Sequence, residues 1–153
     1  MLRKDFPDHH DAELVLRLYD LRREAVMRES RARIMRDFWP ATADELLAVA
    51  RTPDHPLNAP FRQCSTYWEM AYNFARQGVV HADFLVESNG GEGLFLFARV
   101  EPHLATLREA VNPTAFRNAE WVAAECAAGR ALMERFRGRV RAMHAQRAAP
   151  APG

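Results

Sequence analysis

The chain has 153 residues, 48% of them hydrophobic, which fits one domain with a substantial core. Glycine and proline total 16 residues, too few for a collagen-like or disordered chain. The net charge of +1 excludes a strong overall attraction to nucleic acids or anionic membranes. The charge is uneven, because residues 40–112 hold five Arg against nine acidic residues and residues 113–153 hold seven Arg against three.

Targeting and redox features are sparse. The N-terminal stretch MLRKDFPDHHDAEL lacks the apolar run of a signal peptide. The best apolar run, residues 93–100, is far shorter than the ~18–20 residues that span a bilayer. Cys64 and Cys126 belong to no CxxC or zinc-type cluster, although a disulfide between them stays open. These features predict a cytoplasmic protein without a membrane segment.

The first predicted helix runs from Asp8, a suitable N-cap, to Trp39, where Pro40 ends it. A second helix begins at Thr42, because TADE has the form of a capping box, and it ends near Arg51. Three prolines within residues 52–60 predict a stiff loop.

The rest of the chain continues this helical pattern. We expect helices over residues 61–77, closed by a left-handed Gly78, and 81–88, then a flexible turn at 88–93. A fifth segment, 94–111, should break near Val100–Glu101, ahead of Pro102. The last helix should start with Asn112 as cap and Pro113 at its first position and run to Gln146. Residues 1–147 then form one helical domain, and residues 148–153 a disordered tail.

Two long segments carry apolar residues in alternating steps of four and three, the heptad pattern of helices that pack along a seam. The first set is Leu14, Leu18, Leu21, Ala25, Arg28, Ala32, Met35 and Trp39, and the second is Val122, Cys126, Gly129, Met133, Phe136, Val140 and Met143. The similar lengths of the two seams predict antiparallel packing of the terminal helices, within one chain or between two. Gly129 would let a partner backbone approach closely.

Motifs for catalysis or cofactor binding are absent from the sequence. His9, His10, Asp11 and Glu13 cluster near the start, but consecutive His residues point about 100° apart on a helix, so we expect no metal site. NGGEG lacks the Lys-Ser/Thr of a phosphate-binding loop. Six Arg within residues 130–147 split to either side of an apolar stripe, which disfavours nucleic-acid binding. We expect no cofactor.

The densest stretch is YWEMAYNFARQG, residues 67–78, in which Glu69 stands among aromatic residues. A carboxyl group in such surroundings can have a raised pKa and act as an acid or base. The structural alternative, which we favour, is an ion pair with Arg99 or Arg108 in the following segment.

The region 67–125 resembles a family of small bacterial all-helical proteins classed as a domain of unknown function. The resemblance lies in Trp68-Glu69, in Arg76-Gln77-Gly78, in Asp83, in Pro102 with Leu104 and Arg108, and in Glu120-Trp121. It implies an all-helical fold and no established activity. It also implies that Glu69, Arg108, Glu120 and Trp121 lie close together, as a buried network or as the lining of a small pocket.

The sequence therefore predicts an all-α bundle of about six helices and, as its function, a non-enzymatic interaction or scaffold protein. We expect a homodimer or a protein partner, bound through the Leu14/Leu18/Leu21 and Met133/Phe136/Val140 seams. The alternative is a ligand-binding or enzymatic bundle with a pocket formed by Glu69, Tyr72, Arg108, Glu120 and Trp121.

Overall fold

The computed structural model describes residues 4–153 and confirms the all-α class, with no strand in that range. The α-helices are α1 (His9–Arg23), α2 (Ala25–Asp37), α3 (Ala43–Arg51), α4 (Asn58–Arg76), α5 (Ala82–Leu85), α6 (Gly91–Val100), α7 (Leu104–Ala110), α8 (Arg117–Glu125) and α9 (Ala127–Ala148). A π-helical turn, η1 (Val86–Gly90), joins α5 to α6, and a 3-10 turn, η2 (Glu101–His103), joins α6 to α7.

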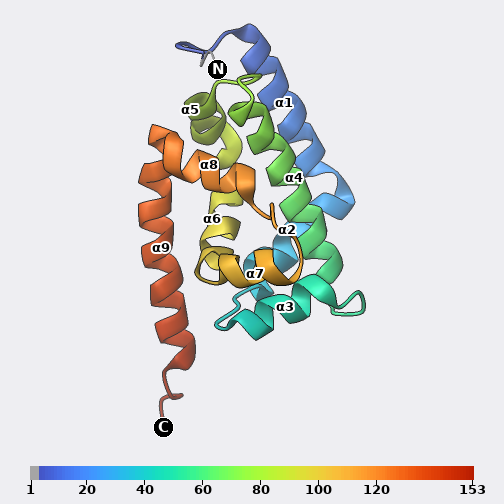
Figure 1. Ribbon diagram of the computed structural model, residues 1–153, viewed down its shortest axis with the longest axis vertical. Coiled ribbons are helices and arrows are strands. Elements are labelled where there is room, and N and C mark those ends of the chain that lie inside the picture. The colour runs from blue at the N-terminus through green and yellow to red at the C-terminus, as the bar shows by residue number, and fades with distance from the viewer. Residues whose placement is uncertain (1–3) are drawn as a thin grey trace.

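Helix α4 runs through one half of the bundle and packs against α2 and α8, while α9 forms the opposite edge and packs against α6 and α8 (Figure 1). The core fills the space between these helices. Tyr72, Leu94, Val122 and Met133 come from four different helices and are all fully buried there.

The residues predicted to cap the start of α1, the start of α3 and the end of α4 are confirmed. Asp8 and Asp11 form a reciprocal capping box at the start of α1. Thr42 Oγ1 accepts a hydrogen bond from Glu45 N at 3.2 Å, at the start of α3. The second half of the expected capping box is not formed, because the Glu45 carboxylate accepts from Ala41 N and not from Thr42 N. Gly78 has φ 74°, the left-handed conformation expected just after α4.

The prediction of one long helix from Asp8 to Trp39 is wrong, because the chain bends at Glu24. The backbone of Glu24 is extended, with φ −58° and ψ 142°, and its carboxylate accepts hydrogen bonds from Val26 N and Met27 N. Glu24 thus caps a new helix, α2. The bend also breaks the predicted seam, since Leu21 is 54% exposed.

The predicted turn at 88–93 is also wrong, since these residues form part of η1 and the start of α6. Gly93 in this stretch allows α6 to pack closely against α4. A side chain at Gly93 would collide with Tyr72 Oη, and its Cβ would lie 2.5 Å from Trp68 Cγ. The break expected ahead of Pro102 is confirmed by η2.

The last predicted helix is two helices, α8 and α9, which meet at an extended Cys126. Asn112 Oδ1 accepts a hydrogen bond from Thr114 N, so Asn112 caps a turn and not the helix. The close approach expected at Gly129 is made by the carbonyl of Val122 in α8. Helix α9 ends at Ala148, and residues 149–153 are not helical, while their disorder stays a prediction.

Within one chain the predicted antiparallel packing of the terminal helices is wrong, while such packing between two chains stays a prediction. Helices α1 and α9 both run downward from the upper part of the molecule, and each packs mainly on other helices (Figure 1). Met133, Phe136 and Val140 are buried inside this chain, as is Leu18. The second seam is therefore not available as the expected interface, because its apolar residues already belong to the core. In the first seam Leu18 is buried and Leu21 is exposed, so an interface through that seam stays a prediction.

The packing of Gly93 predicts a contrast between two glycines. Gly93→Ala should lower the free energy of unfolding by about 1–3 kcal/mol, because the new methyl group overpacks the contact with Tyr72 and Trp68. Gly138→Ala in α9 is the matched control, with its nearest atom 3.9 Å from the new Cβ, and it should stabilise the protein by about 0.5–1 kcal/mol. Urea unfolding followed by circular dichroism measures both. Stabilisation by both changes would contradict the close contact at Gly93.

Candidate functional site

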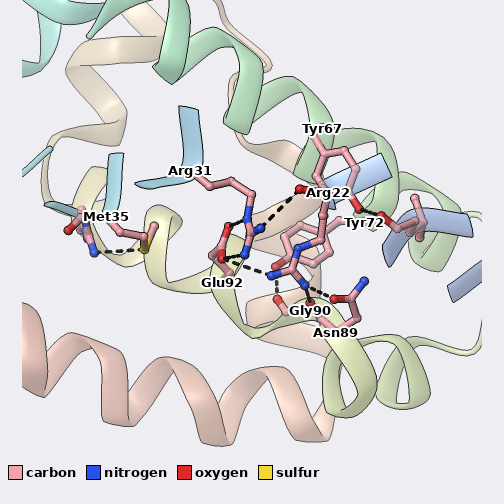
Figure 2. Close-up of polar contacts among 10 residues, drawn as sticks. Arg22, Arg31, Met35, Tyr67, Tyr72, Asn89, Gly90 and Glu92 are labelled. Atoms are coloured by element: carbon pink, nitrogen blue, oxygen red, sulfur yellow. Dashed lines mark hydrogen bonds and ion pairs between the residues drawn. The ribbon is translucent and has the colours of Figure 1, made fainter. Parts of the chain in front are cut away.

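A half-buried polar cluster joins α1, α2 and α6 (Figure 2). Arg31 in α2 donates two hydrogen bonds to the carboxylate of Glu92 in α6, from Nε to Oε1 at 2.7 Å and from Nη2 to Oε2 at 2.7 Å. Arg22, near the end of α1, donates from Nη2 to Glu92 Oε2 at 3.2 Å. Two arginines from either side of the bend at Glu24 thus share one carboxylate.

The cluster continues into the π-helical turn. Arg22 Nη1 donates to the side-chain and backbone oxygens of Asn89 in η1, and its guanidinium lies 5.2 Å from the ring centroid of Trp68. The hydroxyl of Tyr72 donates to the carbonyl of Gly90, as Figure 2 shows. These contacts hold the irregular backbone of η1 against α1 and α4.

This Arg–Glu cluster is suited to holding helices and not to proton transfer. Hydrogen bonding to Glu92 raises the pKa of Arg31 above its already high value, so this guanidinium stays charged. Arg31 Nη1 donates a hydrogen bond to the carbonyl of Arg22 at 3.4 Å. This carbonyl is in the last turn of α1, where the helix itself supplies no hydrogen-bond donor. The cluster therefore fixes the angle between α1 and α2.

Glu69 caps the N-terminus of α8. Its carboxylate accepts hydrogen bonds from Ala119 N at 2.8 Å and Asn118 N at 3.2 Å, and also from the side-chain amide of Asn118. The ion pair expected with Arg99 or Arg108 is not formed. Burial raises the pKa of Glu69 although the hydrogen bonds and nearby Arg117 act to lower it. A carboxylate at a helix N-terminus interacts favourably with the helix dipole, so the geometry gives Glu69 a structural task.

Arg99 has a different role from the one expected. It is almost fully buried in α6, where Nη1 donates to the carbonyls of Ile34 and Phe38 at 2.9 and 3.0 Å, at the C-terminal end of α2. Its guanidinium lies 3.7 Å from the ring centroid of Trp39 and 4.3 Å from that of Phe95. Burial lowers the pKa of Arg99 to about 10, which leaves it charged at neutral pH.

Arg108 and Glu120 do pair, with 2.8 Å between Arg108 Nη2 and Glu120 Oε2, on the exposed side of α8. Arg108 Nε also donates to the carbonyl of Ala115 at 3.0 Å. The structure therefore gathers Glu69, Arg108 and Glu120 around the first turn of α8, but in two separate contacts.

The five residues expected to form a ligand pocket do not line one cavity. Glu69 lines a surface groove of about 410 Å³, and Trp121 lines a separate cavity of about 210 Å³. Tyr72 is fully buried, and Arg108 and Glu120 line neither space. A shared ligand-binding role for all five stays a prediction that this arrangement does not favour.

Two further acids bind backbone N–H groups across the fold, and sequence reasoning missed both roles. Asp83 accepts hydrogen bonds from Cys126 Sγ and from Ala128 N at 2.8 Å, at the start of α9, and the thiol contact leads in lowering its pKa. Asp11, besides capping α1, accepts from His81 N at 3.0 Å, just before α5. Contacts that join residues 43 to 70 positions apart leave no local sequence signal.

Neither cysteine is placed for nucleophilic chemistry. Cys64 and Cys126 are both buried free thiols, and burial raises the pKa of each to about 12. Within residues 4–153, no three His, Cys, Asp or Glu side chains gather in a way that could hold a metal ion. No helix in the same range is both long enough and apolar enough to cross a membrane.

The cluster around Glu92 predicts a large effect of removing one charge. Glu92→Gln should lower the free energy of unfolding by about 2–4 kcal/mol, because two partly buried guanidinium groups lose their counter-charge. Glu87→Gln, on the exposed side of η1, is the matched control and should change it by less than about 0.5 kcal/mol. Urea unfolding at neutral pH measures both. Equal changes in the free energy of unfolding for the two variants would show that the Glu92 cluster stabilises the protein no more than one exposed charge does.

Asp83 and Glu69 should show opposite pH dependence. The folded-state pKa of Asp83 is lowered from 3.8, so its contribution to stability is present above that value and is lost as the pH falls through the folded pKa. The folded-state pKa of Glu69 is raised from 4.5, so its contribution is present below that value and is lost as the pH rises through the folded pKa.

Asp83→Asn should therefore destabilise most at neutral pH, and Glu69→Gln should destabilise more in acid than at neutral pH. Urea midpoints of the wild type and both variants, taken in steps from pH 7 to about pH 3.5, test this. The same direction of change for both variants would contradict the assigned environments.

The comparisons with known proteins give a family but no activity. Neither the curated proteins nor the solved structures contain a match to this chain. Among family models, residues 7–126 match one described as "Domain of unknown function (DUF4760)". The match covers α1 to α8 and ends at Cys126, the break before α9. It spans well over half of the chain and confirms the resemblance to a family of unknown function, so the chain belongs to the DUF4760 family.

Proposed function

We propose that this protein is a non-enzymatic helical interaction domain that self-associates through the outer face of α1. The observation that carries the proposal is a concentration of exposed apolar side chains near the N-terminus. Five of the eight large hydrophobic residues exposed in the described part of the chain lie within residues 6–26. They are Phe6, Leu16, Tyr19, Leu21 and Val26.

The outer face of α1 has the spacing of a helix-packing seam. Ala12, Leu16, Tyr19 and Arg23 follow in steps of four, three and four, so they share one side of the helix. Leu16 is 63% exposed and Tyr19 46% exposed. The guanidinium of Arg23 lies 5.6 Å from the Tyr19 ring centroid and extends this face. Val15 and Leu18, on the adjoining side of the helix, already pack in the core.

A second copy of the chain suits this face better than the two predicted seams do. In an antiparallel pair centred between Leu16 and Tyr19, each Leu16 meets the partner's Tyr19, which is the arrangement of a two-fold interface. The same pairing brings Arg23, near the end of α1, beside the N-terminal end of the other α1. That end carries acidic groups such as Asp8, which attract the charge of Arg23. In the antiparallel pair, the positive end of each helix dipole also lies beside the negative end of the other.

Two observations support the non-enzymatic part of the proposal. The carboxylates of Glu69 and Asp83 already hold helix N-termini, and Arg108 is paired with Glu120. The buried thiols have a pKa of about 12 and are poor nucleophiles at neutral pH. Free buried thiols also suit the cytoplasmic location expected from the sequence.

The oligomeric state tests the proposal. Light scattering coupled to size-exclusion chromatography should give the mass of a dimer for the wild type. The double change Leu16→Glu and Tyr19→Glu should give the monomer mass with an unchanged circular dichroism spectrum, because charges replace the apolar contact. Val111→Glu, at a 44% exposed apolar residue elsewhere on the surface, is the matched control and should remain dimeric.

A monomeric wild type at every concentration tested would contradict self-association. A dimer that survives the double change would place the interface elsewhere and would equally refute the role of α1.

A further inference from the structure

A groove lies between the link from α2 to α3, the loop before α4 and the last turns of α9. Its volume is about 670 Å³. That is within the ~300–1,000 Å³ typical of pockets for small organic ligands. Part of its wall is apolar and is not fully covered by the chain, namely Trp39, Ala41, Ala48 and Leu57. The volume and this wall suit a small organic molecule.

The two carboxylates in the lining are already engaged. Asp37 accepts two hydrogen bonds from Arg36, at 2.9 Å to Oδ1 and 3.0 Å to Oδ2. Glu45 Oε2 accepts a hydrogen bond from Ala41 N at 2.6 Å. The indole N–H of Trp39 likewise donates to the carbonyl of Arg36, at 3.2 Å. Each of these groups therefore has a partner within the chain.

Arg147, the arginine of the lining, is exposed and only loosely held. Its guanidinium lies 5.6 Å from the Trp39 ring centroid, and Nη2 donates one long hydrogen bond, at 3.5 Å, to the carbonyl of Arg36. It attracts Asp37, but that carboxylate already binds Arg36. Most N–H groups of Arg147 are therefore available to a ligand.

Two histidines add N–H donors to the same lining. His55 Nδ1 accepts a hydrogen bond from Leu57 N at 3.0 Å, so in the neutral ring Nε2 carries the proton. His144 meets the Trp39 ring at right angles, 6.5 Å between centroids, and its ring nitrogens form no hydrogen bond within the described chain. The side-chain donors left open in the lining are therefore those of Arg147, His55 and His144.

Positive charge is in excess around the groove. Arg99 lies 3.7 Å from the Trp39 ring centroid and binds backbone carbonyls, with no carboxylate partner. Burial lowers the pKa of Arg99, and the charges of Arg139 and Arg147 lower it further, so the three guanidinium groups act on one another. Neither Arg139 nor Arg147 forms an ion pair within the part of the chain that the structure describes. This arrangement favours an anionic ligand.

We propose that this groove binds a small organic phosphate monoester. The N–H groups of Arg147, His55 and His144 hold the phosphate, and the organic part lies in the groove against Trp39 and Leu57. A phosphate monoester carries about −1.5 to −2 charges at neutral pH and three terminal oxygens, so it can accept hydrogen bonds from all three side chains. A carboxylate offers one charge and two oxygens, which matches a single guanidinium instead.

Calorimetric titration of the full chain with phenyl phosphate and adenosine 5′-monophosphate tests the proposal, with inorganic phosphate and benzoate as comparison probes. At least one of the two monoesters should bind saturably and more tightly than either comparison probe, because inorganic phosphate lacks the organic part and benzoate lacks the phosphate. Arg147→Gln should weaken the binding by about tenfold or more, because a charge-assisted contact is lost. Arg141→Gln, at an exposed arginine of the same helix outside the lining, is the matched control and should bind as the wild type does.

A second readout locates the bound molecule. In the wild type, the monoester should shift the NMR signal of the Trp39 indole N–H, identified by its loss in Trp39→Phe. Both arginine variants should keep the circular dichroism spectrum of the wild type, since both arginines are exposed. No saturable binding by either monoester, binding of a comparison probe as tight as that of the monoesters, or equal binding by Arg147→Gln would each overturn the proposal. A bound monoester that leaves the Trp39 signal unmoved would overturn it as well.

Discussion

The fold depends on supplying hydrogen-bond partners to helix ends from distant parts of the chain. Each helix leaves N–H groups open at its start and carbonyls open at its end, and the described chain is divided into nine α-helices. Glu69 and Asp83 serve the starts of α8 and α9, and Arg99 serves the end of α2. Acids lie at N-termini and the arginine at a C-terminus, as the helix dipole favours.

The Arg–Glu cluster applies the same constraint to the bend between α1 and α2. Arg31 satisfies the carbonyl of Arg22 at the end of α1, and both arginines hold Glu92 in α6. A bend at Glu24 leaves a few open backbone groups, which the side chains of Glu24 and Arg31 meet. Glu92 in α6 then holds the two arginines in place. The bend thereby turns the two halves of the predicted long helix toward different neighbours, α2 against α4 and α1 toward α5 and η1.

Sequence reasoning found what local signals determine and missed what distant contacts determine. The caps at Asp8 and Thr42 and the left-handed Gly78 follow from neighbouring residues, and the structure has all three. The breaks at Glu24 and Cys126 have no proline or glycine to mark them, and groups far along the chain support them. The ion pair expected for Glu69 is not formed, because its partners include backbone N–H groups of α8, which have no signature in the sequence.

The two sides of α1 meet different surroundings. On the inner side, Val15 and Leu18 pack in the core, and Asp11 accepts a hydrogen bond from the backbone N–H of His81 just before α5. On the outer face, Leu16 is 63% exposed and Tyr19 46% exposed. The inner contacts fix the position of α1 in the bundle, so the outer face is presented as a rigid surface, and a rigid surface loses little conformational entropy when a second copy binds to it.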